Sequence, residues 1–184
     1  MRRTLLELTQ SILNDLDGEA VNSIFDTEEA IQYANVVRDT YFNIVAARQT
    51  PEHDELLKLT ALSDATKPTI LKYPVNLKEI RLFEYDGKEV YWKDPIRFLD
   101  NLPNADDPNV VTFTDPVSGI VLTCRSDKGP RYYTSFDNEY LICDSFDLSV
   151  DTTLQESKTR CWGTKYPTFT MSDSFTPDLN ETLF

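Results

Sequence analysis

Hydrophobic residues near the start of the chain recur with the spacing of an amphipathic helix. The helix is predicted to begin at Thr4, because Thr4 and Glu7 have the sequence pattern of a capping box. Asp17 and Gly18 provide the turn residues that would end it. The expected apolar stripe consists of Leu5, Leu8, Ile12 and Leu16.

A second helix is predicted from Asp26 or Thr27 to about Arg48, with Pro51 stopping it soon afterwards. Its expected buried face consists of Ile31, Ala34, Val37, Tyr41, Ile44 and Val45. The short joint between the two helices indicates an antiparallel pair. A pair of this size buries too little apolar surface to be stable alone, so it must pack against another part of the chain.

The pattern becomes strand-like after residue 56. Asp86-Gly87 lies between alternating β-forming residues at 77–85 and 88–92, which is a strong signal for a hairpin. A short helical piece is predicted at 96–102, with Phe98 and Leu99 pointing inward. Further strands are predicted at 110–114, 120–124, 131–135 and 140–145.

The last forty residues are polar, with aromatic residues placed among Thr, Ser, Asp and Pro. The sequence therefore predicts an α+β fold with three parts. These are part of an N-terminal α-helical bundle at 1–52, a mainly antiparallel β domain at 53–147, and an extended C-terminal tail at 148–184. We expect the tail to return to the bundle or to a neighbouring chain, and the apolar ending suggests that the natural chain continues beyond Phe184.

The formal net charge of −13 disfavours a general nucleic-acid-binding surface, because phosphate contacts need clustered Lys and Arg. No apolar run approaches the roughly 20 residues of a membrane span, and the polar residues of the first helix interrupt any signal peptide. We therefore expect synthesis in the cytoplasm and no membrane partner. The three cysteines, Cys124, Cys143 and Cys161, are expected to be buried free thiols.

No catalytic residue, metal site or cofactor is predicted. A single histidine, His53, lies in a charged loop and is expected to be solvated, and the chain contains no C-x-x-C or G-x-S-x-G motif. The glycines do not form a phosphate-binding loop. Acidic pairs occur (Asp106 with Asp107, Asp144 with Asp147, Glu28 with Glu29), but 31 acidic residues make chance pairs inevitable.

Four segments of the chain resemble one known family. Residues 4–24 (T-L-L-E-L-T-Q-S-I-L-N-D-L-D-G-E-A-V-N-S-I) and 26–45 (D-T-E-E-A-I-Q-Y-A-N-V-V-R-D-T-Y-F-N-I-V) resemble bacteriophage head-to-tail adaptors of the tail tubular protein A type. Residues 131–147 and 153–162 look like the β region and trailing segment of the same group. The order of parts agrees with that family, and the shared motifs are structural rather than chemical.

The resemblance implies a structural virion protein without enzymatic activity. Adaptors of this family form a ring, usually of twelve copies, beneath the portal protein in the phage neck. Helices build the ring wall, the β part faces the tail or its nozzle, and terminal segments dock into the portal or neighbouring subunits. Double-stranded DNA passes through the lumen during ejection, and an acidic lumen would keep it mobile by repelling its phosphates.

Two groups of residues are predicted to form the contacts between subunits or with the portal. The first is the exposed polar side of the second helix, and the second is the set of aromatic residues in the tail, since aromatic side chains dominate interface energies. The predicted interface residues are Gln32, Asn35, Arg38, Asp39, Trp162, Tyr166 and Phe169.

Two other functions are consistent with the sequence. A tail-associated carbohydrate-binding module would use Tyr91, Trp92, Tyr132 and Tyr133 to stack on sugars, although packing in the β core is the default for these residues. A hydrolase would use one of the acidic pairs, placed across a cleft.

Overall fold

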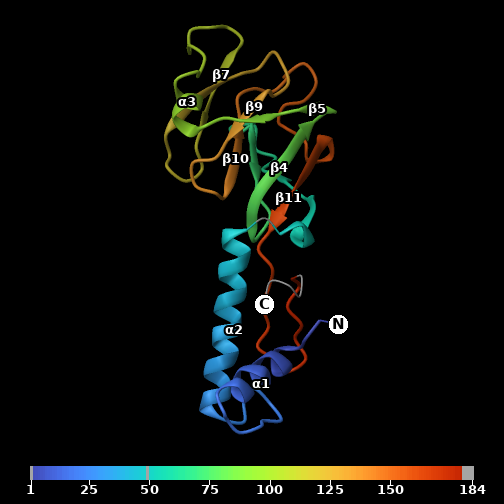
Figure 1. The fold of residues 1–184 in the computed structure, drawn as a ribbon. Coiled ribbons are helices and arrows are strands. Elements are labelled where there is room, and N and C mark those ends of the chain that lie inside the picture. Colours follow the sequence, from blue (N-terminus) through green and yellow to red (C-terminus); the bar gives the residue numbers. More distant parts are fainter. Residues whose placement is uncertain (1, 49, 180–184) are drawn as a thin grey trace. The chain divides into compact units, whose positions relative to one another are not determined.

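The computed structural model describes residues 2–48 and 50–179 (Figure 1). The chain is α+β, as predicted, and it divides into two compact units. The helical unit contains residues 1–54 and 166–184, and the β unit contains residues 55–165. The β unit is therefore an insertion in the helical unit, and it ends 18 residues later than the expected boundary at 147. The expected continuation beyond Phe184 lies outside the described residues.

The helical unit contains α1 (Leu5–Asp15), α2 (Glu28–Ala47) and the short 3-10 helix η1 (Pro51–His53). The predicted capping box of α1 is confirmed: the Glu7 amide donates to Thr4 Oγ1 at 3.2 Å, and the Thr4 amide donates to Glu7 Oε2 at 2.7 Å. At the start of α2, the Ala30 amide donates to Thr27 Oγ1 at 3.0 Å. Both helices therefore begin where their capping residues predicted.

The buried face of α1 is rotated slightly from the predicted one, whereas that of α2 differs mainly at its first residue. On α1, Leu5, Thr9 and Leu13 are buried, whereas Leu16 follows the last helical turn and is exposed. The buried stripe of α2 contains Ala34, Val37, Tyr41 and Val45 as predicted, but Ala30 takes the place of Ile31, which is 36% exposed. That stripe consists of Ala30, Ala34, Val37, Tyr41 and Val45.

The C-terminal segment at 166–179 completes the helical unit. It runs beside the helices in Figure 1, and the Leu5 amide donates to the Phe175 carbonyl at 2.7 Å. Asp173 Oδ1 accepts from the Ile24 amide at 2.8 Å. Phe169, Met171 and Phe175 pack on the buried faces of α1 and α2, and Leu179 is buried with Tyr41 and Val45. The segment thus contributes to the core of the helical unit.

The β unit contains two main sheets, a separate hairpin, one short α-helix and one 3-10 helix. The four-stranded sheet has the order β1-β11-β4-β5, the five-stranded sheet has the order β2-β3-β10-β9-β6, and β7 pairs with β8. The elements are β1 (Asp54–Leu57), β2 (Thr60–Ala61), β3 (Ile70–Lys72), β4 (Leu77–Tyr85), β5 (Lys88–Glu89), β6 (Tyr91–Trp92), α3 (Pro95–Leu99), β7 (Val110–Thr114), β8 (Val121–Arg125), β9 (Tyr132–Thr134), β10 (Tyr140–Cys143), the 3-10 helix η2 (Glu156–Lys158) and β11 (Thr159–Lys165).

The strand β11 was not predicted. It pairs antiparallel with β4 from Thr159, opposite Tyr85, to Lys165, opposite Leu77. Residues 159–165 therefore form an inner strand of a sheet, where the sequence indicated an extended tail.

The predicted hairpin turn between β4 and β5 is confirmed. Asp86 and Gly87 have φ angles of 51° and 74°, the left-handed conformation that a two-residue turn of this kind requires. After Val90 the chain passes from β5 to β6, at the edge of the other sheet. The predicted short helix is α3, in which Phe98 is buried but Leu99 is exposed, contrary to expectation.

The three cysteines are buried free thiols, as predicted. Burial raises the pKa of Cys124 and of Cys161 to about 12, and it also raises the pKa of Cys143. The neutral thiol is therefore the stable form of each, and thiolates are the reactive species.

We expect the native chain to react with a water-soluble aromatic disulfide reagent at pH 8 far more slowly than the unfolded chain, which should release three equivalents of chromophore. Reaction of any thiol in the native chain at the rate measured in guanidinium would contradict the burial described here.

Candidate functional site

The predicted interface residues of α2 lie on its outer face. At 100° per residue, Gln32, Asn35 and Asp39 project opposite the buried stripe, and Arg38 lies at its flank. Arg38 donates through Nε and a terminal nitrogen to Asp39 Oδ1 at 3.0 and 2.9 Å. The same outer face carries Val36, which is 52% exposed. An apolar side chain is therefore presented to solvent among polar ones.

The predicted tail aromatics have different surroundings. Trp162 belongs to β11 and is partly exposed, and Tyr166 is partly exposed in the helical unit. The Phe169 ring lies 5.6 Å from Tyr41 and 4.4 Å from Phe175, measured between centroids. The Phe169 ring thus packs within the helical unit of its own chain.

His53 is half-buried, in contrast to the expected solvated position. Its Nδ1 lies 3.1 Å from Thr50 Oγ1, and its ring lies 6.4 Å from the Tyr41 ring. Its Nε2 is buried and has no hydrogen-bond partner among the described residues.

The acidic residues of the hydrolase alternative mostly stabilise local structure. Asp144 Oδ1 accepts from the amides of Arg131 and Tyr132 at 2.9 and 3.0 Å. Asp147 Oδ1 accepts from the amide and hydroxyl of Ser149. Across residues 2–48 and 50–179, no cluster of three His, Cys, Asp or Glu side chains could hold a metal ion, and no helix could cross a membrane.

The aromatic residues of the carbohydrate-binding alternative come together at one edge of the five-stranded sheet. The edge strand β6 pairs parallel to β9, with Tyr91 opposite Tyr132 and Trp92 opposite Tyr133. Tyr91 and Trp92 are 51% and 53% exposed. Tyr133 is buried, with its ring 5.4 Å from Phe83 and 5.3 Å from Trp92. Three of the four rings therefore reach the surface, and the fourth belongs to the core.

Basic side chains surround Tyr132 at this edge. Lys93 Nζ lies 4.5 Å from the centre of the Tyr132 ring, and the Arg131 guanidinium carbon lies 5.3 Å from it. Beside the ring is a pocket of about 200 Å³. It is lined by Lys93, Phe98, Asn101, Leu102, Pro103, Arg125, Lys128, Tyr132 and Asp144. We call this the Tyr132 pocket.

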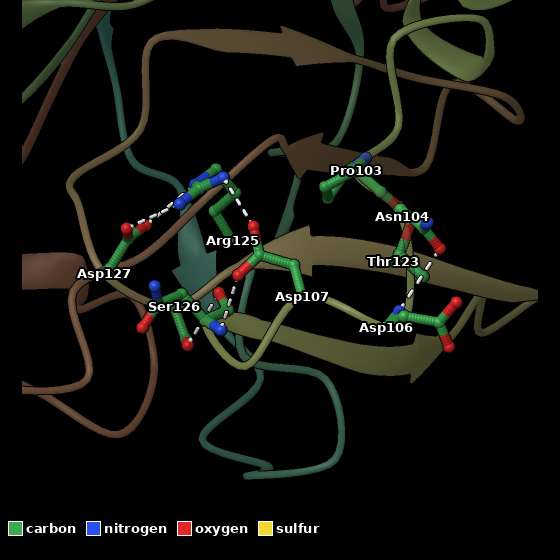
Figure 2. Close-up of polar contacts among 9 residues, drawn as sticks. Pro103, Asn104, Asp106, Asp107, Thr123, Arg125, Ser126 and Asp127 are labelled. Carbon is green, nitrogen blue, oxygen red and sulfur yellow. Dashed lines mark hydrogen bonds and ion pairs between the residues drawn. The ribbon is translucent and has the colours of Figure 1, made fainter.

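Arg125 forms one wall of the Tyr132 pocket and is held by two carboxylates, as Figure 2 shows. It donates to Asp127 through Nε at 2.9 Å and a terminal nitrogen at 2.7 Å, and to Asp107 Oδ2 at 3.2 Å. The Arg125 guanidinium lowers the pKa of the Asp127 carboxyl. Thr123 Oγ1 also donates to the Pro103 carbonyl at 2.8 Å. These bonds fix the loop at 103–109 against β8.

Sequence reasoning missed the Tyr132 pocket and its arginine. The β7–β8 register, with Val110 opposite Arg125, brings Arg125 close to Asp107. Antiparallel pairing of the two predicted strands could have indicated that contact. The approach of Lys93 and Lys128 to the same pocket depends on the pairing of β6 with β9, for which the sequence carries no local signal.

No known family model matches the chain, and no curated protein sequence matches it.

Proposed function

We propose that the chain is a structural virion protein, a subunit of the head-to-tail adaptor ring in a bacteriophage neck. In this role it joins the portal protein to the tail or its nozzle and has no catalytic activity. The ring has twelve copies in the family that the sequence resembles, and its lumen forms part of the channel for DNA ejection.

The order of the parts supports this proposal. A helical unit, a β insertion and a returning C-terminal segment follow one another along the chain, as in the family that residues 4–24 and 26–45 resemble. The net charge of −13 also fits a channel component, since an acidic lumen repels DNA phosphates and lets the duplex slide. As part of the same proposal, the helices complete a bundle within the ring wall.

The observation that carries the proposal is the outer face of α2. Gln32, Val36, Asp39 and Asn43 are separated by four, three and four residues, so they form one row along the helix. The buried stripe faces the unit's own core, so this second row is open to another molecule. A head-to-tail contact through such a row closes into a ring when each copy is rotated by the same angle.

Replacing Val36 with Lys tests this surface. Val36 is 52% exposed in the single chain, so the substitution should leave the fold intact. In a ring it would place an ammonium group in an interface, and we expect association to weaken about thirtyfold or more, as for an interface hot spot. Size-exclusion chromatography with light scattering and negative-stain imaging, with and without the portal oligomer of the same phage, would measure assembly.

The matched control is Val75→Lys, because Val75 is 82% exposed and lies in the β unit between β3 and β4. It should assemble as the wild type does. The proposal is contradicted if Val36→Lys assembles normally, or if the wild-type chain remains monomeric both alone and with the portal.

A carbohydrate-binding module is the second candidate, because Tyr91 and Trp92 are exposed at one sheet edge, beside the half-buried Tyr132. Sugars stack on such rings. Host-surface polysaccharide binding that is lost in Trp92→Ala would favour this function over the adaptor.

A further inference from the structure

We propose that the Tyr132 pocket binds a phosphate monoester that carries a small apolar group. The inference rests on the unpaired cations at the pocket, on its size and on its apolar wall. It does not depend on ring assembly.

Lys and Arg side chains without an ion pair are concentrated near the Tyr132 pocket. Most of the 18 Lys and Arg residues lie in ion pairs or have other polar partners, as expected when 31 acidic residues surround them. In the part of the chain that the structure describes, Lys93, Lys128 and Arg131 have no ion pair. Lys93 and Arg131 lie over the Tyr132 ring, and Lys128 lines the same pocket. The remaining basic residues without an ion pair are Arg3, Lys88 and Arg97. Half of the unpaired cations are therefore gathered at one place on an acidic molecule.

The carboxylates near these cations have hydrogen-bond partners of their own. Asp144 lines the pocket, but its Oδ1 is occupied by the amides of Arg131 and Tyr132 and by the Ser145 hydroxyl at 3.3 Å. Asp107 and Asp127 are held by Arg125. The hydrogen bonds of these carboxylates go to partners other than Lys93 and Lys128, although the charge of Lys128 also helps to lower the pKa of the Asp127 carboxyl. Neither lysine is in an ion pair among the described residues, so both ammonium groups remain able to form charge-assisted hydrogen bonds to an external anion.

The cations that line the pocket suit a phosphate better than a carboxylate. A carboxylate is best bound bidentately by a guanidinium group, but the Arg125 fork is already occupied by Asp127 and Asp107. The unpaired Arg131 guanidinium lies over the Tyr132 ring but is not part of the pocket lining, so the unpaired cations that line the pocket are the ammonium groups of Lys93 and Lys128. Ammonium groups act as point charges and suit the three oxygens of a phosphate. The two positive charges of Lys93 and Lys128 also match a phosphate dianion.

The Tyr132 pocket is larger than a phosphate group and has an apolar wall. A pocket of about 200 Å³ has the volume of about seven water molecules, which exceeds the volume of a bare phosphate ion. Phe98, Leu102 and Pro103 form an apolar wall beside the cations. The space left by the phosphate is therefore suited to a small apolar or aromatic group.

Isothermal titration calorimetry of the full chain at low salt would test the proposal, with phenyl phosphate, benzoate and a short single-stranded oligonucleotide as probes. We expect phenyl phosphate to bind with a dissociation constant below about 1 mM and more tightly than benzoate. Lys93→Gln and Lys128→Gln should each weaken phenyl phosphate binding about tenfold, which is the loss of one charge-assisted hydrogen bond. Binding should also weaken as salt is added.

The matched control is Lys88→Gln, since Lys88 is an unpaired lysine of the same unit that lies outside the Tyr132 pocket. It should bind phenyl phosphate as the wild type does, and circular dichroism should show that all three variants are folded. Four results would overturn the proposal: no binding by the wild type, benzoate binding as tight as phenyl phosphate, equal losses in Lys88→Gln, or binding of the oligonucleotide alone.

Discussion

Gly163→Ala is expected to destabilise the β unit by about 3 kcal/mol, the upper part of the usual range for overpacking. Gly163 lies in β11, between β1 and β4 in the sheet. A Cβ atom at this position would lie 2.2 Å from the Glu79 carbonyl oxygen and 2.8 Å from Leu57 Cδ1. The first of these atoms belongs to the backbone of β4, so the clash can be relieved only by moving the two strands apart.

Urea unfolding followed by tryptophan fluorescence would measure this effect, because both tryptophans, Trp92 and Trp162, lie in the β unit. Gly129→Ala is the matched control, since a Cβ at Gly129 would meet no atom within 4 Å. The control should change stability by less than about 0.5 kcal/mol. If the two variants unfold at the same urea concentration, the close packing of β11 on β4 is refuted.

The elements that could be predicted are those whose signals are local. The capping box of α1 depends on Thr4 and Glu7, which are three residues apart, and the β4–β5 turn depends on Asp86 and Gly87 alone. In each case the residues that specify the conformation are also those that adopt it. The α+β class and most strand positions followed from such local patterns.

The elements that could not be predicted depend on contacts between distant residues. Strand β11 pairs with β4, about 80 residues earlier in the chain. Its own sequence contains no aliphatic residue, and Cys161 and Trp162 are its only apolar side chains, so it lacks the local pattern of a buried strand. The exposure of Ile31 and Leu99 likewise depends on which neighbour covers each helix. Such choices are made by tertiary packing, and spacing alone gives the buried face only to within one residue.

The predicted interface residues have different surroundings for the same reason. The polar outer face of α2 follows from helical periodicity, so Gln32 and Asp39 are exposed as expected. Phe169 was predicted to contact a neighbouring chain, but it packs against Tyr41 and Phe42. The Tyr132 pocket combines residues of α3, β8 and β9 with residues of the loops that follow β6, α3, β8 and β10, and only the folded chain brings them together.

Removal of residues 166–184 is expected to unfold the helical unit while the β unit stays folded. The segment supplies Phe169, Met171 and Phe175 to the core around Leu5 and Ala34. An isolated pair of helices of this length is marginal in water once its apolar stripe loses its cover. A deletion from residue 148 would be a poor test of the same segment, because it would also remove β11 from the sheet.

Circular dichroism at 222 nm would report the loss of α1 and α2 in the truncated chain, and tryptophan fluorescence would report the β unit separately. Two point variants place the effect within the segment. Phe169→Ala should lower helix stability by about 2 kcal/mol, because Phe169 is half-buried against Tyr41. Tyr166→Ala should have little effect, because Tyr166 is 40% exposed. Full helix content after truncation would mean that the helices are stable without this segment, and the C-terminal residues would then be free to act as the arm that the adaptor family uses to reach a neighbour.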